Sequence, residues 1–258
     1  MQGPDDDLAL LIQAAERAGE IAGQFFQRDP QIWDKGSEGP VTEADLAIDT
    51  MLRETLLGAR PDYGWLSEET EDDAARLSTD TVFICDPIDG TRAFIEGGRS
   101  FAHSLSVVHR GQVTAGVVFL PMRDKLYAAA KGQGTTLNGQ PVRVTGAKDP
   151  AQSIFLTTKA NLKPEHWPNG IPAVERAYRP SLAYRMSLVG EGRFDGMMTF
   201  RPTWEWDIAA GALIIEEAGG RATTSRGAPL VFNGQSAQVD GILAGAPDVH
   251  QALVAQRA

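Results

Sequence analysis

The spacing of apolar residues predicts helices near both ends of the chain and within it. Apolar side chains recur three and four positions apart over residues 5–28 and again after Thr42, as in an amphipathic helix. Acidic residues at positions 5–7 favour the positive end of the first helix, and Asp45 stands where a capping box with Thr42 requires it. Further helices are expected in the segments PSLAYRMSLVGEG, DIAAGALIIEEAGG (ending at Gly219 or Gly220) and PDVHQALVAQR.

Other segments are predicted to form strands joined by tight turns. Residues 82–85 are a wholly apolar run, which indicates a strand covered on both faces. Turns at residues 110–111 and 138–139 predict two hairpins, and SIFLTT, FDGMMTF and GILAGA are further strands. Because helices and strands mix without a strict βαβ rhythm, we expect a layered α+β and α/β sandwich with at least one antiparallel sheet. An N-terminal α+β half (residues 1–147) and a C-terminal α/β half (148–258) should form one compact catalytic unit.

Composition narrows the classes of partner. The 258 residues carry a formal net charge of −10 and contain no block rich in lysine and arginine, so long DNA or RNA is not an expected partner. The single cysteine, Cys85, lies in the apolar run and is interpreted as a core residue. The acidic start differs from a signal peptide, and no apolar stretch approaches the roughly 20 residues of a membrane span. We expect a cytoplasmic protein without a membrane role.

The segment DPIDGT, residues 86–91, carries candidate metal chemistry. Asp86, Asp89 and the carbonyl of Ile88 offer an all-oxygen site, which suits a hard cation such as Mg²⁺. Free N–H groups of Gly90 and Thr91, at the start of a short helix, would bind an anion. From the residues alone, an aspartate-rich turn that merely caps a helix remains the alternative.

Four more acids bear on that choice. Glu68 and Glu69 end the preceding strand-like segment, Asp207 opens a later helix, and Asp45 lies in the second helix. Carboxylates gathered in one place repel one another unless a cation compensates them or some take up protons. Spacing alone leaves open whether they meet.

Three blocks, SEE, DPIDGT and WDIAAG followed by EEAGG, resemble the inositol monophosphatase superfamily of Mg²⁺-dependent, lithium-sensitive phosphatases. The resemblance covers essentially the whole chain. It implies that family's layered fold, two or three Mg²⁺ ions and commonly a homodimer. In such a site, paired metals activate water and stabilise the leaving oxygen of a phosphate ester.

The resemblance also implies residue roles. Thr91 would position the attacking water with Glu68, and Asp45 would accept a hydrogen bond from the Thr91 hydroxyl. The amides of Gly90 and Thr91 would hold phosphate oxygens, and Lys35 would lie near a third metal and the phosphate. The implied metal ligands are Glu68, Asp86, the Ile88 carbonyl, Asp89 and Asp207.

The substrate is less firmly indicated. DGTRAFIEGG and FRPTWEWD are similar to bacterial 3′(2′),5′-bisphosphate nucleotidases, which favours 3′-phosphoadenosine 5′-phosphate. Inositol 1-phosphate, or a histidinol or sugar phosphate, is the alternative, and a non-catalytic homologue that binds metal or ligand is an alternative of another class. Arg92 and Glu96 are interpreted as solvated helix charges. Candidate substrate-binding residues are Ser181, Arg179, Arg185, Arg201, Trp204 and Asp207.

Overall fold

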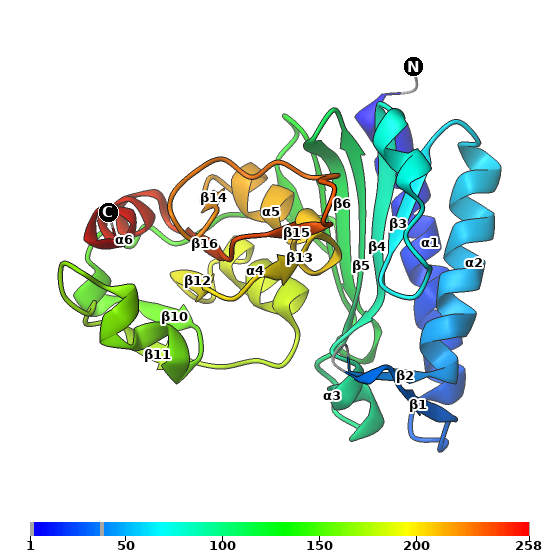
Figure 1. The fold of residues 1–258 in the computed structure, drawn as a ribbon, viewed down its shortest axis with the longest axis horizontal. Helices are drawn as coiled ribbons and strands as arrows, with labels where there is room; N and C mark the ends of the chain where they lie inside the picture. The colour runs from blue at the N-terminus through cyan, green and yellow to red at the C-terminus, as the bar shows by residue number, and fades with distance from the viewer. Residues whose placement is uncertain (1–2, 37–38, 258) are drawn as a thin grey trace.

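The computed structural model describes residues 3–36 and 39–257 and shows five layers (Figure 1). Helices α1 (Pro4–Phe25) and α2 (Glu43–Ala59) cover one face of a seven-stranded sheet. Helices α4 (Leu182–Gly190) and α5 (Glu205–Glu217) lie between that sheet and a five-stranded one, and α6 (Pro247–Arg257) covers the far side. The layered sandwich expected from the sequence is confirmed.

The seven-stranded sheet carries the DPIDGT segment. Its strand order is β3-β4-β5-β6-β7-β8-β9, and only the β3–β4 pair is parallel. Short helix α3 (Thr91–Ile95) follows β4 directly. The strands are β3 (Gly64–Ser67), β4 (Thr81–Asp89), β5 (Ala102–His109), β6 (Gln112–Leu120), β7 (Lys125–Ala130), β8 (Thr135–Leu137) and β9 (Gln140–Val142).

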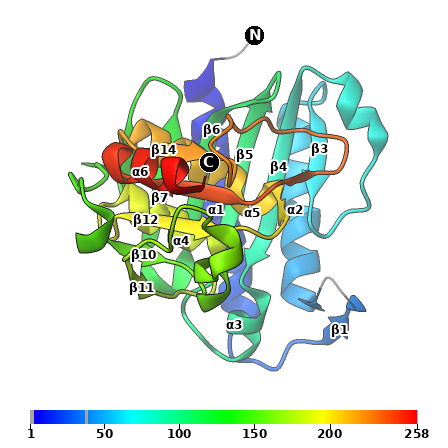
Figure 2. The ribbon, with the colours of Figure 1, turned by 60° about the vertical axis from the view of Figure 1, so that its left-hand side comes forward.

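The five-stranded sheet is built wholly from later residues, in the order β11-β10-β12-β16-β14. Figure 2 shows it with α6 in front of α4 and α5. Its strands are β10 (Ile154–Leu156), β11 (Glu175–Ala177), β12 (Gly196–Thr199), β14 (Arg221–Thr223) and β16 (Ile242–Gly245). The paired strands β1 (Ile32–Asp34) with β2 (Pro40–Thr42) and β13 (Thr203–Trp204) with β15 (Gln238–Val239) complete the described strands.

Short 3-10 turns link these elements: η2 (Ala74–Ser78), η3 (Pro121–Arg123), η4 (Pro150–Gln152), η5 (Lys159–Leu162) and η6 (Pro164–His166). None of the helices in the described part of the chain is long and apolar enough to cross a membrane.

Three apolar clusters explain the layering, and the smallest of them packs α6 against the five-stranded sheet. The two larger ones position the acids. One lies between α1, α2 and the large sheet and includes Cys85, which is fully buried. The other joins the two sheets through α4 and α5, and most residues of α5 are buried. A helix that is apolar on all sides requires cover on all sides, so α5 belongs between two sheets. Its N-terminus is thereby held against the large sheet.

Several predicted elements differ in detail. The first helix ends at Phe25 rather than at residue 28, because the backbone of Phe26 is extended (φ −61°, ψ 122°) and Gln27 then adopts a left-handed conformation with φ of 58°. Residues 32–34 form the short strand β1, which the sequence pattern did not predict. The hairpins at residues 110–111 and 138–139 are confirmed, as is the capping box of Thr42 and Asp45. Helix α5 is followed by Gly219 with φ of 87°, the left-handed glycine expected there.

Candidate active site

A bulge in β4 brings two aspartates to the same side of the large sheet. Successive side chains of a strand point to opposite faces, so Asp86 and Asp89, three positions apart, would otherwise diverge. Asp86 pairs with Ser104 and Asp89 with Ala102, so three steps along β4 match two along β5. Such a bulge bends the strand, and Pro87 within it has no N–H to pair. The bulge explains how DPID presents both carboxylates together.

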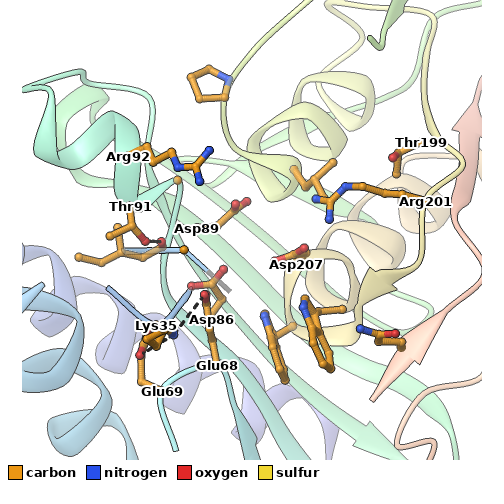
Figure 3. Close-up of a pocket in the computed structure, with 18 of the residues that line it drawn as sticks. Lys35, Glu68, Glu69, Asp86, Asp89, Thr91, Arg92, Thr199, Arg201 and Asp207 are labelled. Atoms are coloured by element: carbon orange, nitrogen blue, oxygen red, sulfur yellow. Dashed lines mark hydrogen bonds and ion pairs between the residues drawn. The ribbon is translucent and has the colours of Figure 1, made fainter. Parts of the chain in front are cut away.

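The third carboxylate comes from the C-terminal half of the chain. Asp207 lies in the first turn of α5, which the second core holds against the large sheet. One carboxylate oxygen from each of Asp86, Asp89 and Asp207 lies within 4.8 Å of the other two. Figure 3 shows these three side chains around one point between the sheet and α5. Acids from distant segments therefore do meet.

The surroundings of Asp86 indicate whether this cluster fits a cation. Its side chain is 1% exposed, and neither carboxylate oxygen has a hydrogen-bond partner among the described residues. Burial first, and then the charges of Glu68 and Asp89, raise the pKa of Asp86 well above its usual range. A buried carboxylate without a partner is strongly unfavourable unless a cation accompanies it. The all-oxygen donor set fits a hard divalent cation such as Mg²⁺.

Asp89 is held by the N-terminus of α4. Its Oδ2 accepts hydrogen bonds from the Ser181 hydroxyl and the Ala183 amide, each at 2.6 Å. Ser181 is the N-cap of α4, and its Oγ accepts from the Tyr184 amide at 2.9 Å. The Ser181 side chain, which is fully buried, therefore orients the Asp89 carboxylate.

Glu68 lies beside the three-carboxylate cluster rather than within it. Lys35 Nζ lies 2.9 Å from Glu69 Oε2 and 3.6 Å from Glu68 Oε1, so one ammonium bridges both glutamates. Burial first, and then the charge of Glu69, raise the pKa of Glu68 to about 7. The charge of Glu68 in turn raises the pKa of Asp86, so the two groups share one electrostatic environment. Figure 3 shows Glu68 directed toward Asp86.

Thr91 connects the cluster to α2. Its hydroxyl lies 3.1 Å from the Ile88 carbonyl oxygen and 3.3 Å from Asp45 Oδ1, so one proton faces two acceptors. The other oxygen of Asp45 accepts from the Thr42 amide and hydroxyl in the capping box. Burial raises the pKa of Asp45. The capping box thus fixes the carboxylate that faces Thr91.

Gly90 permits the turn from β4 into α3. Its φ of 102° lies in the left-handed region, which glycine adopts without strain. This turn directs the start of α3 toward the cavity and places Gly90 and Thr91 on the cavity wall.

The acids open onto a large cavity of about 1190 Å³ between the two halves of the chain. Asp45 and Ser181, also predicted to act in the site, lie behind this wall in hydrogen-bond contact with Thr91 and Asp89. Trp204 lines the cavity and stacks on Trp206, with ring centroids 4.6 Å apart. The predicted residues on the wall are Lys35, Glu68, Asp86, Ile88, Asp89, Gly90, Thr91, Arg185, Arg201, Trp204 and Asp207.

Arg179 and Arg92 lie differently with respect to the cavity. Arg179 is not on the described cavity wall; it donates to the carbonyl of Tyr178 and stacks over Phe194, 5.5 Å from that ring centroid. Arg92 is exposed, as expected for a solvated helix charge, and it also lines the cavity. Because α3 begins at the bulge, its exposed side overlooks the acids, and helical spacing within α3 cannot show this.

Sequence reasoning also missed what His103 does. This fully buried histidine is bonded through Nδ1 to the Pro87 carbonyl, opposite the bulge. Its Nε2 has no partner among the described residues, and burial lowers the pKa of the ring to about 4, so it is neutral. The unusual position of a histidine within an apolar strand is the only sequence signal for it.

The family model for the inositol monophosphatase family matches residues 4–258. The chain belongs to the inositol monophosphatase family. It is a phosphatase of that family, as expected from its motifs.

Similar proteins within this family carry different names. The inositol-1-monophosphatase of Rhizobium meliloti is 32% identical, with 95% of this chain and 94% of that protein covered. The histidinol-phosphatase of Chlorobaculum parvum is 31% identical, with coverage of 89% and 90%. Family membership therefore does not by itself select one phosphate ester.

Solved structures agree with the fold. The extragenic suppressor protein suhB of Bartonella henselae superimposes with a TM-score of 0.85 at 27% identity, covering 97% of this chain and 98% of that one. The SaIMPase-II of Staphylococcus aureus with bound 2′AMP gives 0.82 at 26% identity, covering 96% and 92%. The name of the first protein states no reaction, and the second structure contains a bound nucleotide.

Proposed function

We propose that this chain hydrolyses a small phosphate monoester in the presence of Mg²⁺, at the cluster of Asp86, Asp89 and Asp207. The observation that carries this proposal is Asp86, whose two buried oxygens have no hydrogen-bond partner among the described residues. Bound divalent cations would supply water activation and leaving-group stabilisation in such a site. The residues that would hold them are Glu68, Asp86, the Ile88 carbonyl, Asp89 and Asp207.

The remaining residues orient the reactants. The Thr91 hydroxyl, with Asp45 and the Ile88 carbonyl as its acceptors, is positioned to bind and orient a water molecule. A hydroxyl with two fixed acceptors can keep its own lone pairs directed toward the cavity. The amides at the start of α3 would bind phosphate oxygens, and Lys35 would contribute positive charge near Glu68.

The proposed substrate is a small phosphorylated metabolite. The motif-based preference for 3′-phosphoadenosine 5′-phosphate remains a hypothesis; the bound 2′AMP of SaIMPase-II is consistent with a nucleotide. The names of the two similar phosphatases favour inositol 1-phosphate and histidinol phosphate instead. Three ester classes are therefore to be compared directly.

The test is phosphate release from these three esters at one fixed concentration of Mg²⁺, with and without lithium. We expect turnover of at least one ester that requires Mg²⁺ and is inhibited by lithium. Tight Mg²⁺ binding without turnover of any ester would instead support a non-catalytic homologue, a reading that the suhB name leaves open. The ratio of kcat/KM values among the esters decides the substrate.

Two further expectations rest on the family resemblance. We propose two or three Mg²⁺ ions per active site and a homodimer. Calorimetric titration with Mg²⁺ would count the ions. Light scattering coupled to size exclusion would give the oligomeric state, and a monomer at all concentrations would contradict the second expectation.

A further inference from the structure

The wall of the cavity that comes from residues 158–201 differs in charge from the wall that carries the acids. This part of the lining contains no acidic residue among those described, whereas the acids lie at positions 68–89 and 207. Its polar residues come from η5, α4 and the ends of β11 and β12. They are Thr158, Asn161, Tyr178, Arg185, Thr199 and Arg201.

Arg185 is a buried cation that forms no ion pair with the described carboxylates, although the charge of Asp89 acts on it. Its residue is 6% exposed, and its guanidinium donates to the carbonyls of Arg179 and Pro180. Its Cζ also lies 4.5 Å from the ring centroid of Tyr178. Burial is the main cause that lowers the pKa of Arg185, because a charge kept away from water is unfavourable. The carbonyls orient the group but supply no opposite charge.

Arg201 adds a second guanidinium near the first. Figure 3 shows its side chain reaching into the cavity toward Asp89 and Asp207, from the side opposite Arg92. Its positive charge acts on both Asp207 and Arg185. No hydrogen bond or ion pair of its guanidinium occurs with the described residues.

The segment that carries Arg201 is held in place. Asn161 accepts from the Phe200 amide at 3.1 Å and donates to the Met198 carbonyl at 3.1 Å. These two bonds attach the end of β12 to η5. The backbone beside Arg201 is therefore preorganised, which lowers the entropy lost when that side chain binds a ligand.

Charge balance indicates what the two arginines bind. Both arginines interact electrostatically with Asp207, and Arg185 also interacts with Asp89. These carboxylates are the groups that divalent cations would neutralise. With those cations bound, two guanidiniums would remain close together without an opposite charge on their own wall. Arginine binds phosphate and carboxylate groups through paired hydrogen bonds.

We propose that Arg201 and Arg185 form a second anion subsite, which selects phosphate esters that carry a further phosphate or carboxylate group. This inference rests on the proposed phosphatase activity and specifies its substrate class. The scissile phosphate binds at the acid cluster, and the second anion binds at the wall formed by residues 158–201. Inositol 1-phosphate, with one anionic group, would leave this subsite empty.

The test compares matched esters with and without a second anion at fixed free Mg²⁺. Adenosine 3′,5′-bisphosphate is paired with adenosine 3′-monophosphate, and 3-phosphoglycerate with glycerol 3-phosphate. Wild type should prefer the doubly anionic member, and Arg201→Met should reduce that ratio of kcat/KM values about tenfold or more, as for a lost charged hydrogen bond. Arg201→Lys should restore part of the ratio. The pair that responds identifies phosphate or carboxylate as the second group.

The control is Arg226→Met, which removes an exposed arginine that faces Asp240 outside the cavity lining. Its ratio should equal that of wild type, and thermal melting should show that all variants fold. Equal loss for both members of each pair in Arg201→Met would overturn the subsite, because Arg201 would then act on the acid cluster. A wild-type enzyme that does not prefer the doubly anionic ester would overturn it as well.

A binding measurement separates this inference from the proposed function. If no ester is hydrolysed, the phosphatase proposal fails, and calorimetry of adenosine 5′-monophosphate against adenosine still tests the subsite. Wild type should bind the nucleotide more tightly than the nucleoside, and Arg201→Met should lose about tenfold of that difference. Equal binding of both compounds to wild type would reject the anion subsite.

Discussion

Two buried carboxylates, Asp49 and Asp86, lie on opposite faces of the large sheet and differ in their hydrogen bonding. On the face covered by α2, Asp49 accepts hydrogen bonds from the hydroxyls of Ser67 at 2.5 Å and Thr70 at 2.6 Å. On the other face, Asp86 has two buried oxygens and no hydrogen-bond partner in the described part of the chain. Both side chains are less than a tenth exposed.

The difference separates a structural acid from a functional one. The hydroxyl partners of Asp49 offset the cost of burying its charge within the chain itself. Asp86 has no such compensation, so its surroundings disfavour the charged form, and a ligand is needed to reverse this. Asp89 is intermediate, since Ser181 and Ala183 satisfy only one of its oxygens.

The largest expected difference between Asp86 and Asp49 is in enzymatic activity. Asp86→Asn should lower kcat/KM by roughly a thousandfold or more, because the cluster loses a charged metal ligand. The fold should persist, with a melting temperature at or above that of metal-free wild type. Phosphate release and circular dichroism measure the two effects, and near-wild-type turnover at saturating Mg²⁺ would refute the assignment.

Mg²⁺ should stabilise the folded protein through Asp86 and not through Asp49. At a hundred times its dissociation constant, a ligand specific for the folded state adds about 2.7 kcal/mol to the free energy of unfolding. We expect a corresponding rise in melting temperature for wild type and for Asp49→Asn, and little rise for Asp86→Asn. A similar Mg²⁺-induced rise in all three proteins would place the ion elsewhere.

Asp49→Asn is the matched test of the satisfied acid. Replacing one accepting oxygen with an amide breaks the pairing with Ser67 or Thr70, which should lower the free energy of unfolding by about 1–3 kcal/mol. Activity should fall far less than in Asp86→Asn, because Asp49 contacts the cavity wall only through the hydroxyls of Ser67 and Thr70. Urea unfolding measures the first quantity, and a large fall in kcat without loss of stability would contradict this view.

Ser181→Ala removes one of the two hydrogen-bond donors to Asp89, the acid that is intermediate between Asp49 and Asp86. Without the hydroxyl, Asp89 keeps only the Ala183 amide, so its carboxylate should orient less well. Loss of a partner that orients a metal ligand typically weakens metal binding by about tenfold or more. Isothermal titration with Mg²⁺ checks this, and Ser187→Ala, which removes a helix hydroxyl bonded to Ala183, is the control. Unchanged affinity would show that the amide suffices.

The smallest expected effect is a pH dependence in the metal-free protein. The pKa of Glu68 is about 7 in the fold and 4.5 without it, so its proton stabilises the folded state. That stabilisation is complete below about pH 4.5 and is lost as pH rises through 7. Relative to Glu68→Gln, the melting temperature of wild type should fall by several degrees between pH 5 and pH 8. A constant difference across this range would mean that Glu68 is not perturbed.

Much of the site was predictable because its ligands are local in sequence. DPIDGT places two carboxylates, a carbonyl and two amides within six residues, and the capping box of Thr42 and Asp45 depends only on neighbouring residues. The apolar run of β4 and the turn residues of the hairpins likewise predicted their elements. Local hydrogen bonding and side-chain periodicity determine such features, so a linear pattern is enough.

Other features were decided only by tertiary packing. The bulge that aligns Asp86 with Asp89 depends on the register between β4 and β5, and the place of Asp207 depends on how α5 is buried between two sheets. The cavity-facing side of Arg92 and the contact of His103 with Pro87 arise in the same way. The chain by itself determined which donors are available and which elements carry them. Their meeting around one point required three-dimensional packing, because burial and register are set by partners far away in the sequence.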